Sequence, residues 1–156
     1  GPVYLRFGRP KVANFTPADQ NFEIGKGILL QEGTDVTIVA TGHLVWEALE
    51  AAKTLQANGI SAEVINIHTI KPLDKDIIIK SVGKTGAIVT AEEHNYLGGL
   101  GESVARVLAE STPTPQEFIA TQDTFGESGT PAQLMDKYGL NAAAIVKASE
   151  KVIQRK

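Results

Sequence analysis

The chain has 156 residues, of which 42% are apolar and 21% charged, and a formal net charge of −3. These values suit one globular domain, and no basic cluster follows any helix that we can draw, so we expect neither nucleic acid nor a membrane as a partner. The absence of cysteine excludes disulfides, thiolate metal sites and cysteine nucleophiles. With no apolar run of membrane-spanning length, we expect a cytoplasmic protein.

The first residues are β-prone but have no hairpin partner nearby. Val3 to Phe7 form a short apolar run that Gly8, Arg9 and Pro10 end. We interpret this run as the last strand of a preceding domain, followed by a linker over residues 10–23. Arg9 stands at a strand end, where an arginine can clamp a phosphate or carboxylate. The alternative is an ordinary solvated or ion-paired arginine.

Apolar and β-branched runs then alternate with helical periodicity. An edge strand or hairpin is predicted at 24–30. The core strands are predicted at 36–40, 62–67, 87–90 and 117–120, with helices at 44–57, from 75, and from about 100 to 110. The β-α-β alternation predicts an α/β fold, a three-layer α/β/α arrangement with a mainly parallel five-stranded sheet.

The last part of the chain carries helix-capping signals. Thr130, Pro131 and Gln133 have the types and spacing of a capping box with proline at the first helical position. Gly139 ends this short helix, and Asn141 caps a terminal helix. Asp74 is likewise placed to cap the helix that follows it. These signals predict the starts of three helices, where a side-chain oxygen can accept a backbone N–H that the helix leaves unpaired.

A candidate site lies where the strand at 87–90 meets the next helix. The strand is followed by an acidic turn, a histidine and a glycine-rich bend. In parallel sheets such junctions are where ligands or partners bind, and a helix N-terminus offers N–H groups to anions. The alternative is that the glycines only allow a sharp turn and close packing. With the turn after the strand at 36–40, the junction predicts an anion, nucleotide or interface crevice of Thr41, Gly42, His43, Glu92, His94, Gly98, Gly99 and Gly101.

Two further residues have two interpretations each. Trp46 falls off the apolar stripe of its helix, so it either lies over a neighbouring loop or belongs to a protein interface. His68 follows a strand, where a hydrogen-bonded structural histidine is favoured over a catalytic one. The three histidines are far apart and lack metal-binding spacing, so no metal site is predicted.

Three segments resemble the C-terminal domain of transketolases, and more closely the C-terminal subunit of split, two-polypeptide transketolases. They are HTIKPLD at 68–74, TAEEHNYLGGLG at 90–101 and DTFGESGTPAQLMDKYGL at 123–140. The TIKPLD stretch is shared with 1-deoxyxylulose-5-phosphate synthases and the beta subunits of 2-oxoacid dehydrogenases, whereas FGESG favours transketolase. The resemblance implies the end of a pyrimidine-binding domain and a linker at 1–16, and a transketolase C-terminal domain at 17–156.

The resemblance also implies a function for the intact protein. The family transfers a two-carbon ketol unit between sugar phosphates, in the pentose phosphate pathway, with thiamine diphosphate and magnesium. The GDG and asparagine motif that holds this cofactor is absent from the sequence, as is the activating glutamate of the pyrimidine-binding domain. The resemblance therefore implies an inactive fragment with no bound cofactor and no catalytic residue.

The implied partners are the N-terminal cofactor-binding part or subunit and a second copy in a homodimer. By resemblance, Arg9 would bind the substrate phosphate. Two alternatives keep the fold: the C-terminal domain of a 2-oxoacid dehydrogenase beta subunit, which docks a partner, or that of a 1-deoxyxylulose-5-phosphate synthase.

Overall fold

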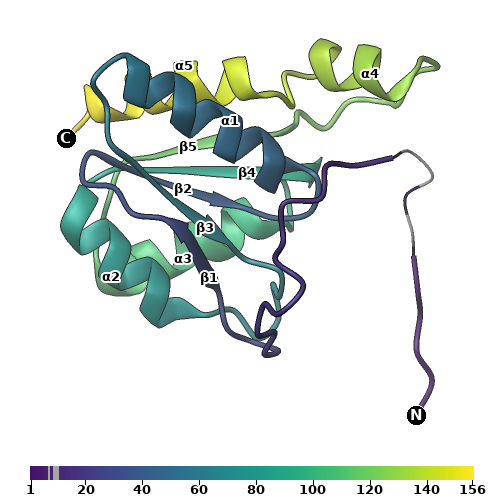
Figure 1. Cartoon of the computed structure of the whole chain (residues 1–156), viewed down its shortest axis with the longest axis horizontal. Helices are drawn as coiled ribbons and strands as arrows, with labels where there is room; N and C mark the ends of the chain where they lie inside the picture. The colour runs from purple at the N-terminus through teal and green to yellow at the C-terminus, as the bar shows by residue number, and fades with distance from the viewer. Residues whose placement is uncertain (7, 9–10) are drawn as a thin grey trace.

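The computed structural model describes residues 1–6, 8 and 11–156. Within them the chain alternates strands and helices (Figure 1). The strands are β1 (Ile28–Gln31), β2 (Val36–Ala40), β3 (Ala62–Asn66), β4 (Ile88–Asn95) and β5 (Gln116–Thr121). The helices are α1 (Leu44–Ala57), α2 (Lys75–Thr85), α3 (Leu100–Ser111), α4 (Pro131–Lys137) and α5 (Ala142–Ile153).

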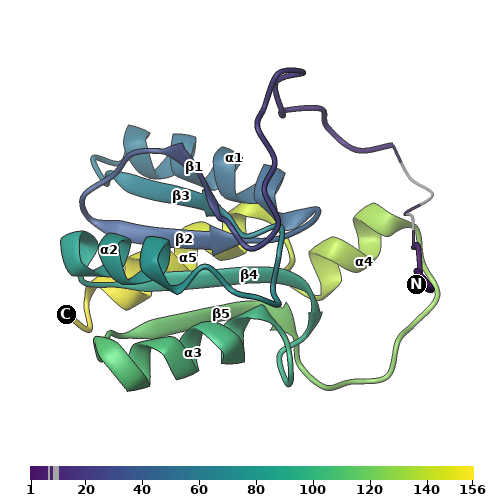
Figure 2. The ribbon, with the colours of Figure 1, turned by 90° about the horizontal axis from the view of Figure 1, so that it is seen from below.

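The strands form a five-stranded sheet in the order β1-β3-β2-β4-β5 (Figure 2). All neighbouring pairs are parallel except β1 with β3, which is antiparallel. The predicted mainly parallel five-stranded sheet is therefore confirmed. Of the two alternatives predicted at the start, the edge strand is the one formed, because β1 pairs with β3 and not with β2, its neighbour in sequence.

Helices cover both faces of the sheet. Helices α1 and α5 lie against one face and contact each other, and α2 and α3 lie against the other (Figure 1). Two buried apolar clusters fill the spaces between these layers. All five residues of β2 are buried, as expected of a central parallel strand covered on both faces. The three-layer α/β/α arrangement is thus confirmed.

A buried hydroxyl cluster joins β2 to α2. The Thr37 Oγ1 lies 2.6 Å from the Ser81 hydroxyl and 2.7 Å from the Thr85 hydroxyl. All three residues are at most 2% exposed. The Thr85 hydroxyl also donates to the Ser81 carbonyl, so the polar atoms buried here satisfy one another.

The predicted caps are present. The Asp74 carboxylate accepts the Ile77 N–H at the start of α2, and the Asn141 side chain accepts the Ala144 N–H at the start of α5. At α4 the capping box of Thr130 with Gln133 is complete. Side-chain oxygens thus satisfy N–H groups that the helix itself leaves unpaired.

One local prediction was wrong. The strand predicted at 87–90 continues to Asn95, so Glu92 and Glu93 belong to β4 and form no acidic turn. Glu92 is moreover only 2% exposed. The run from Val3 to Phe7 stays a prediction, because it was assigned to the sheet of a preceding domain; in this chain residues 1–6 are exposed and form no strand. Phe7 itself lies outside the described residues.

Candidate functional site

The predicted crevice residues lie on the connections that leave β2 and β4 at the carboxyl edge of the sheet. Strands β2 and β4 are neighbours, but β3, which follows β2 in the chain, lies on the other side of β2. The connections leaving β2 and β4 therefore run to opposite faces of the sheet. Such a topological switch point is where open α/β sheets commonly bind ligands or partners.

Glu92 occupies the N-terminus of α3. One carboxylate oxygen accepts the Leu100 N–H at 2.7 Å and the other accepts the Gly101 N–H at 2.8 Å. A carboxylate at this position also interacts favourably with the helix dipole. The N–H groups that an external anion would bind are thus already hydrogen bonded within the chain.

The glycines of the bend have packing roles. Gly98 has a φ of 76°, in the left-handed region. A Cβ on Gly99 would collide with the Glu92 carboxylate, and a Cβ on Gly101 would lie 2.6 Å from the Phe118 ring. These observations favour the interpretation of the glycines as a sharp turn and a close helix-to-strand approach.

Of the predicted residues, His43 forms a surface ion pair, and its partner Glu93 was not among them. The His43 Nδ1 lies 2.8 Å from the Glu93 carboxylate, so the turn after β2 is tied to the end of β4. Both side chains are substantially exposed. His94 does not join them, because its Nδ1 lies 2.7 Å from the backbone carbonyl of Asn95. The structure thus brings together His43 and Glu93 and leaves His94 apart.

Trp46 is covered by the segment that precedes the sheet. The Phe15 ring stacks on it with ring centroids 6.2 Å apart, and the Lys53 ammonium lies 5.4 Å from the Trp46 ring centroid. These contacts favour the predicted position of Trp46 over a neighbouring loop. Phe15 itself was missed by sequence reasoning, although an aromatic residue in an otherwise polar linker was an available signal.

A second aromatic contact holds the same segment at the end of β3. The rings of Phe22 and His68 have centroids 4.0 Å apart. The His68 Nδ1 lies 2.9 Å from the Thr69 hydroxyl, while its Nε2 is buried without a hydrogen-bond partner. This environment agrees with the structural role predicted for His68. Phe22 was also missed.

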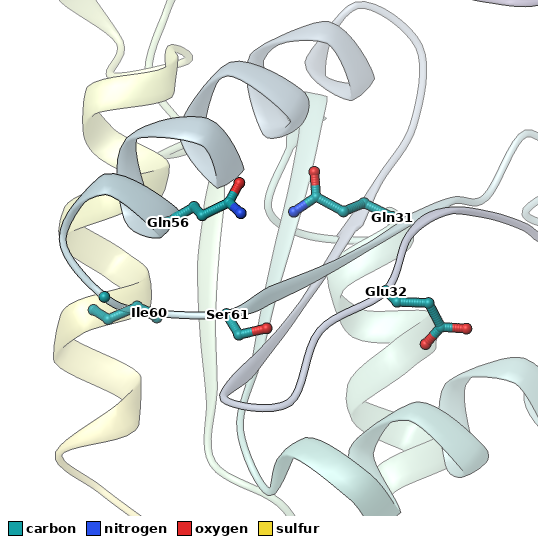
Figure 3. Close-up of a pocket in the computed structure, with 6 residues that line it drawn as sticks. Gln31, Glu32, Gln56, Ile60 and Ser61 are labelled. Carbon is teal, nitrogen blue, oxygen red and sulfur yellow. The ribbon is translucent and has the colours of Figure 1, made fainter.

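A surface depression lies at the opposite edge of the sheet. Gln31 and Gln56 face each other across it, beside Ile60 and Ser61 (Figure 3). It adjoins the amino end of β3 and the C-terminus of α1, away from the crevice residues.

Among residues 1–6, 8 and 11–156 no three histidine or acidic side chains are grouped as a metal site. No helix in this part of the chain is long and apolar enough to cross a membrane.

Two ion clusters lie away from the carboxyl edge. Partial burial raises the pKa of Glu117, but hydrogen bonds from Lys151 and Arg155 outweigh this effect and leave the pKa below its ordinary value of 4.5. Across the sheet, Lys84 binds Glu32 at 2.8 Å and also binds Glu63, which is only 3% exposed. Hydrogen bonds to these two carboxylates raise the pKa of Lys84. Both clusters join a strand to a helix and are structural.

Strand order, helices on both faces and a polar carboxyl edge define a doubly wound α/β domain. The family model described as "Transketolase, C-terminal domain" matches residues 25–145. The chain therefore belongs to the transketolase C-terminal domain family, as the sequence motifs indicated. Arg9, the predicted phosphate-binding residue, lies outside both the matched range and the described residues.

Curated relatives and a solved structure agree with this membership. The chain is 46% identical over 156 residues to the 6-deoxy-6-sulfo-D-fructose transketolase subunit SqwH of Clostridium sp. (strain MSTE9), covering 100% of this chain and 48% of that protein. It is 40% identical over 161 residues to 1-deoxy-D-xylulose-5-phosphate synthase 1 of Geobacter sulfurreducens, covering 100% of this chain and 25% of that protein.

A structure titled "Split gene transketolase, inactive beta4 tetramer" superimposes with a TM-score of 0.89 at 48% identity. The match covers 92% of this chain and 47% of that one. The chain thus spans about half the length of the split-transketolase relatives, and a quarter of the synthase.

Proposed function

We propose that the chain serves as the C-terminal domain of a thiamine-diphosphate-dependent transketolase that works in the cytoplasm. The observation that carries this proposal is the 46% identity, over the whole chain, to a transketolase subunit of which it covers 48%. The remaining half of such a protein would supply the cofactor site. The intact protein would transfer a two-carbon ketol unit between sugar phosphates, as in the pentose phosphate pathway.

The residues described here do not fit the cofactor. The N-terminus of α3, which could bind a diphosphate, is filled by the Glu92 carboxylate. In the described part of the chain no acidic or histidine cluster is arranged to hold magnesium. Cofactor binding is therefore assigned to the N-terminal part or subunit.

This domain is proposed to contribute packing and one substrate contact. Its carboxyl edge, with the exposed pair of His43 and Glu93, would form an interface with the neighbouring domain or with a second copy in a homodimer. An interface is favoured over an anion site because the N–H groups of Leu100 and Gly101 are already bonded. Arg9 would bind the phosphate of the sugar substrate.

A second candidate is the corresponding domain of a 1-deoxyxylulose-5-phosphate synthase. The 40% identity to the Geobacter enzyme supports it. The FGESG segment at 125–129 favours transketolase. The two functions differ in the product formed by the intact protein, which an assay can separate.

Thermal unfolding with and without the cofactor tests whether the cofactor site lies in the N-terminal part and not in this chain. We expect thiamine diphosphate with magnesium to leave the melting temperature of this chain unchanged and to raise that of the chain combined with its N-terminal part, because a ligand stabilises only the folded state that binds it. A clear rise for the chain alone would contradict the assignment of the cofactor site to the other half.

A further inference from the structure

The segment before the sheet is held against the carboxyl edge at several points. We call residues 15–22 the strap. At one end Phe15 stacks on Trp46 in the first turns of α1, and at the other Phe22 packs on His68 after β3. Both views of the ribbon show this dark purple segment passing along the edge where the strands end (Figures 1 and 2). The strap therefore crosses the edge that also carries the predicted crevice.

The chain after the strap is fixed as well. The Gly27 N–H donates to the Asp74 carboxylate at 2.9 Å, and that carboxylate also caps α2. A Cβ on Gly25 would lie 3.0 Å from the Pro72 ring, and Gly25 has a φ of 84°. The backbone thus lies close to the segment before α2, and the downstream end of the strap has little freedom.

The upstream end depends on Phe15. Among the described residues, Phe15 is the first in the chain whose apolar side chain packs against the core cluster. Lys11, Val12 and Asn14, just before it, are exposed. Along the described residues, the contact between Phe15 and Trp46 is therefore the first aromatic contact that holds the chain against this domain.

We propose that the stacking of Phe15 on Trp46 is a latch that fixes where the preceding segment enters the neighbouring part of the protein. Phe15 and Trp46 are then positioning residues. For the substrate contact this inference rests on the proposed function of Arg9, which shortly precedes Phe15 in the sequence. With the latch broken, the strap would be less often docked, and the preceding segment would reach its binding position less often.

The stacking of Phe15 on Trp46 can be measured without an enzyme assay. Trp46 is the single tryptophan of the chain, so its emission reports directly on Phe15. We expect Phe15→Ala to shift the emission to longer wavelength and to increase quenching by acrylamide, with the urea midpoint of the core almost unchanged. Phe15→Leu should give an intermediate change. Phe125→Ala, at a ring that is 98% exposed, is the matched control and should change nothing. Unchanged emission in Phe15→Ala would overturn the latch.

The positioning step needs the chain combined with its N-terminal part. An aromatic contact corresponds to about a 2- to 10-fold change in an equilibrium constant. We therefore expect Phe15→Ala to raise the KM for the sugar phosphate by about that factor while kcat stays near that of the unaltered protein. In an Arg9→Ala background the same substitution should have no further effect on KM, because the two residues act through one contact.

The outcomes separate the two claims. An unchanged KM in Phe15→Ala, or an equal rise with and without Arg9, would overturn the positioning role even if the emission shifts. An Arg9→Ala variant with an unchanged KM would refute the phosphate role of Arg9, and the positioning role with it, while the emission measurement would still decide on the latch itself.

Discussion

The carboxylate of Glu92 is predicted to be a main determinant of stability at the carboxyl edge. It is 2% exposed and accepts two backbone N–H groups of α3. Hydrogen bonds to a charged group contribute about 1.5–3 kcal/mol each. Glu92→Gln keeps the shape and one acceptor oxygen but turns an amide N–H₂ toward a backbone donor. We expect the free energy of unfolding to fall by about 2–5 kcal/mol, a large part of the 5–15 kcal/mol typical of a domain.

Urea unfolding followed by circular dichroism measures this loss. With a slope of about 1–3 kcal/mol per molar urea, the midpoint should fall by about 1 M or more at unchanged slope. Glu150→Gln, at an exposed position on α5, is the matched control and should stay within about 0.5 kcal/mol of the original protein. If Glu92→Gln behaves like this control, the two N–H groups do not depend on the carboxylate and the reasoning fails.

Three further predictions concern the fold. Thr37→Val should lower the free energy of unfolding by about 1–3 kcal/mol, because it leaves buried hydroxyls with fewer partners; a loss below 0.5 kcal/mol in urea would contradict this. The pKa of Glu117 is lowered in the folded state, so the stability it contributes should be present above about pH 4.5 and disappear as pH falls through the folded pKa. Unfolding of Glu117→Gln should therefore differ from that of the original protein at pH 7 and converge with it in acid; a constant difference would refute the linkage. Gly99→Ala should lower the free energy of unfolding by more than about 2 kcal/mol, because the added Cβ would collide with a buried carboxylate. Gly83→Ala, in open space on α2, is the control and should raise the free energy of unfolding by about 0.5–1 kcal/mol. Similar melting temperatures for the two variants would argue against the close approach of Gly99 to Glu92.

Most elements followed from local patterns. The period of apolar residues predicted β2 and α1, and side-chain caps marked the starts of α2, α4 and α5. These signals act between residues that are near in sequence, so one sequence is enough to find them.

The extension of β4 could not be read in this way. Two consecutive glutamates are typical of a turn, and only the N–H groups of α3, supplied after the glycine bend, make a buried Glu92 favourable. The pattern of apolar residues therefore predicted where β4 begins. Where it ends depends on the tertiary contact of Glu92 with α3.

The candidate site was predicted in part. The meeting of the turn at Thr41 to His43 with the end of β4 follows from parallel strand order, and the ion pair between His43 and Glu93 lies there. The contacts of Trp46 and His68 did not follow, because their partners Phe15 and Phe22 lie in a linker with no periodicity. Contacts between distant segments without a repeating pattern need the fold to be known.

Ketol transfer by the intact protein tests the central claim most directly. The chain is assayed alone and combined with its N-terminal part, with xylulose 5-phosphate, ribose 5-phosphate, thiamine diphosphate and magnesium. We predict ketol transfer only in the combined protein. Ketol transfer by the chain alone, or no ketol transfer by the combined protein, would contradict the assignment.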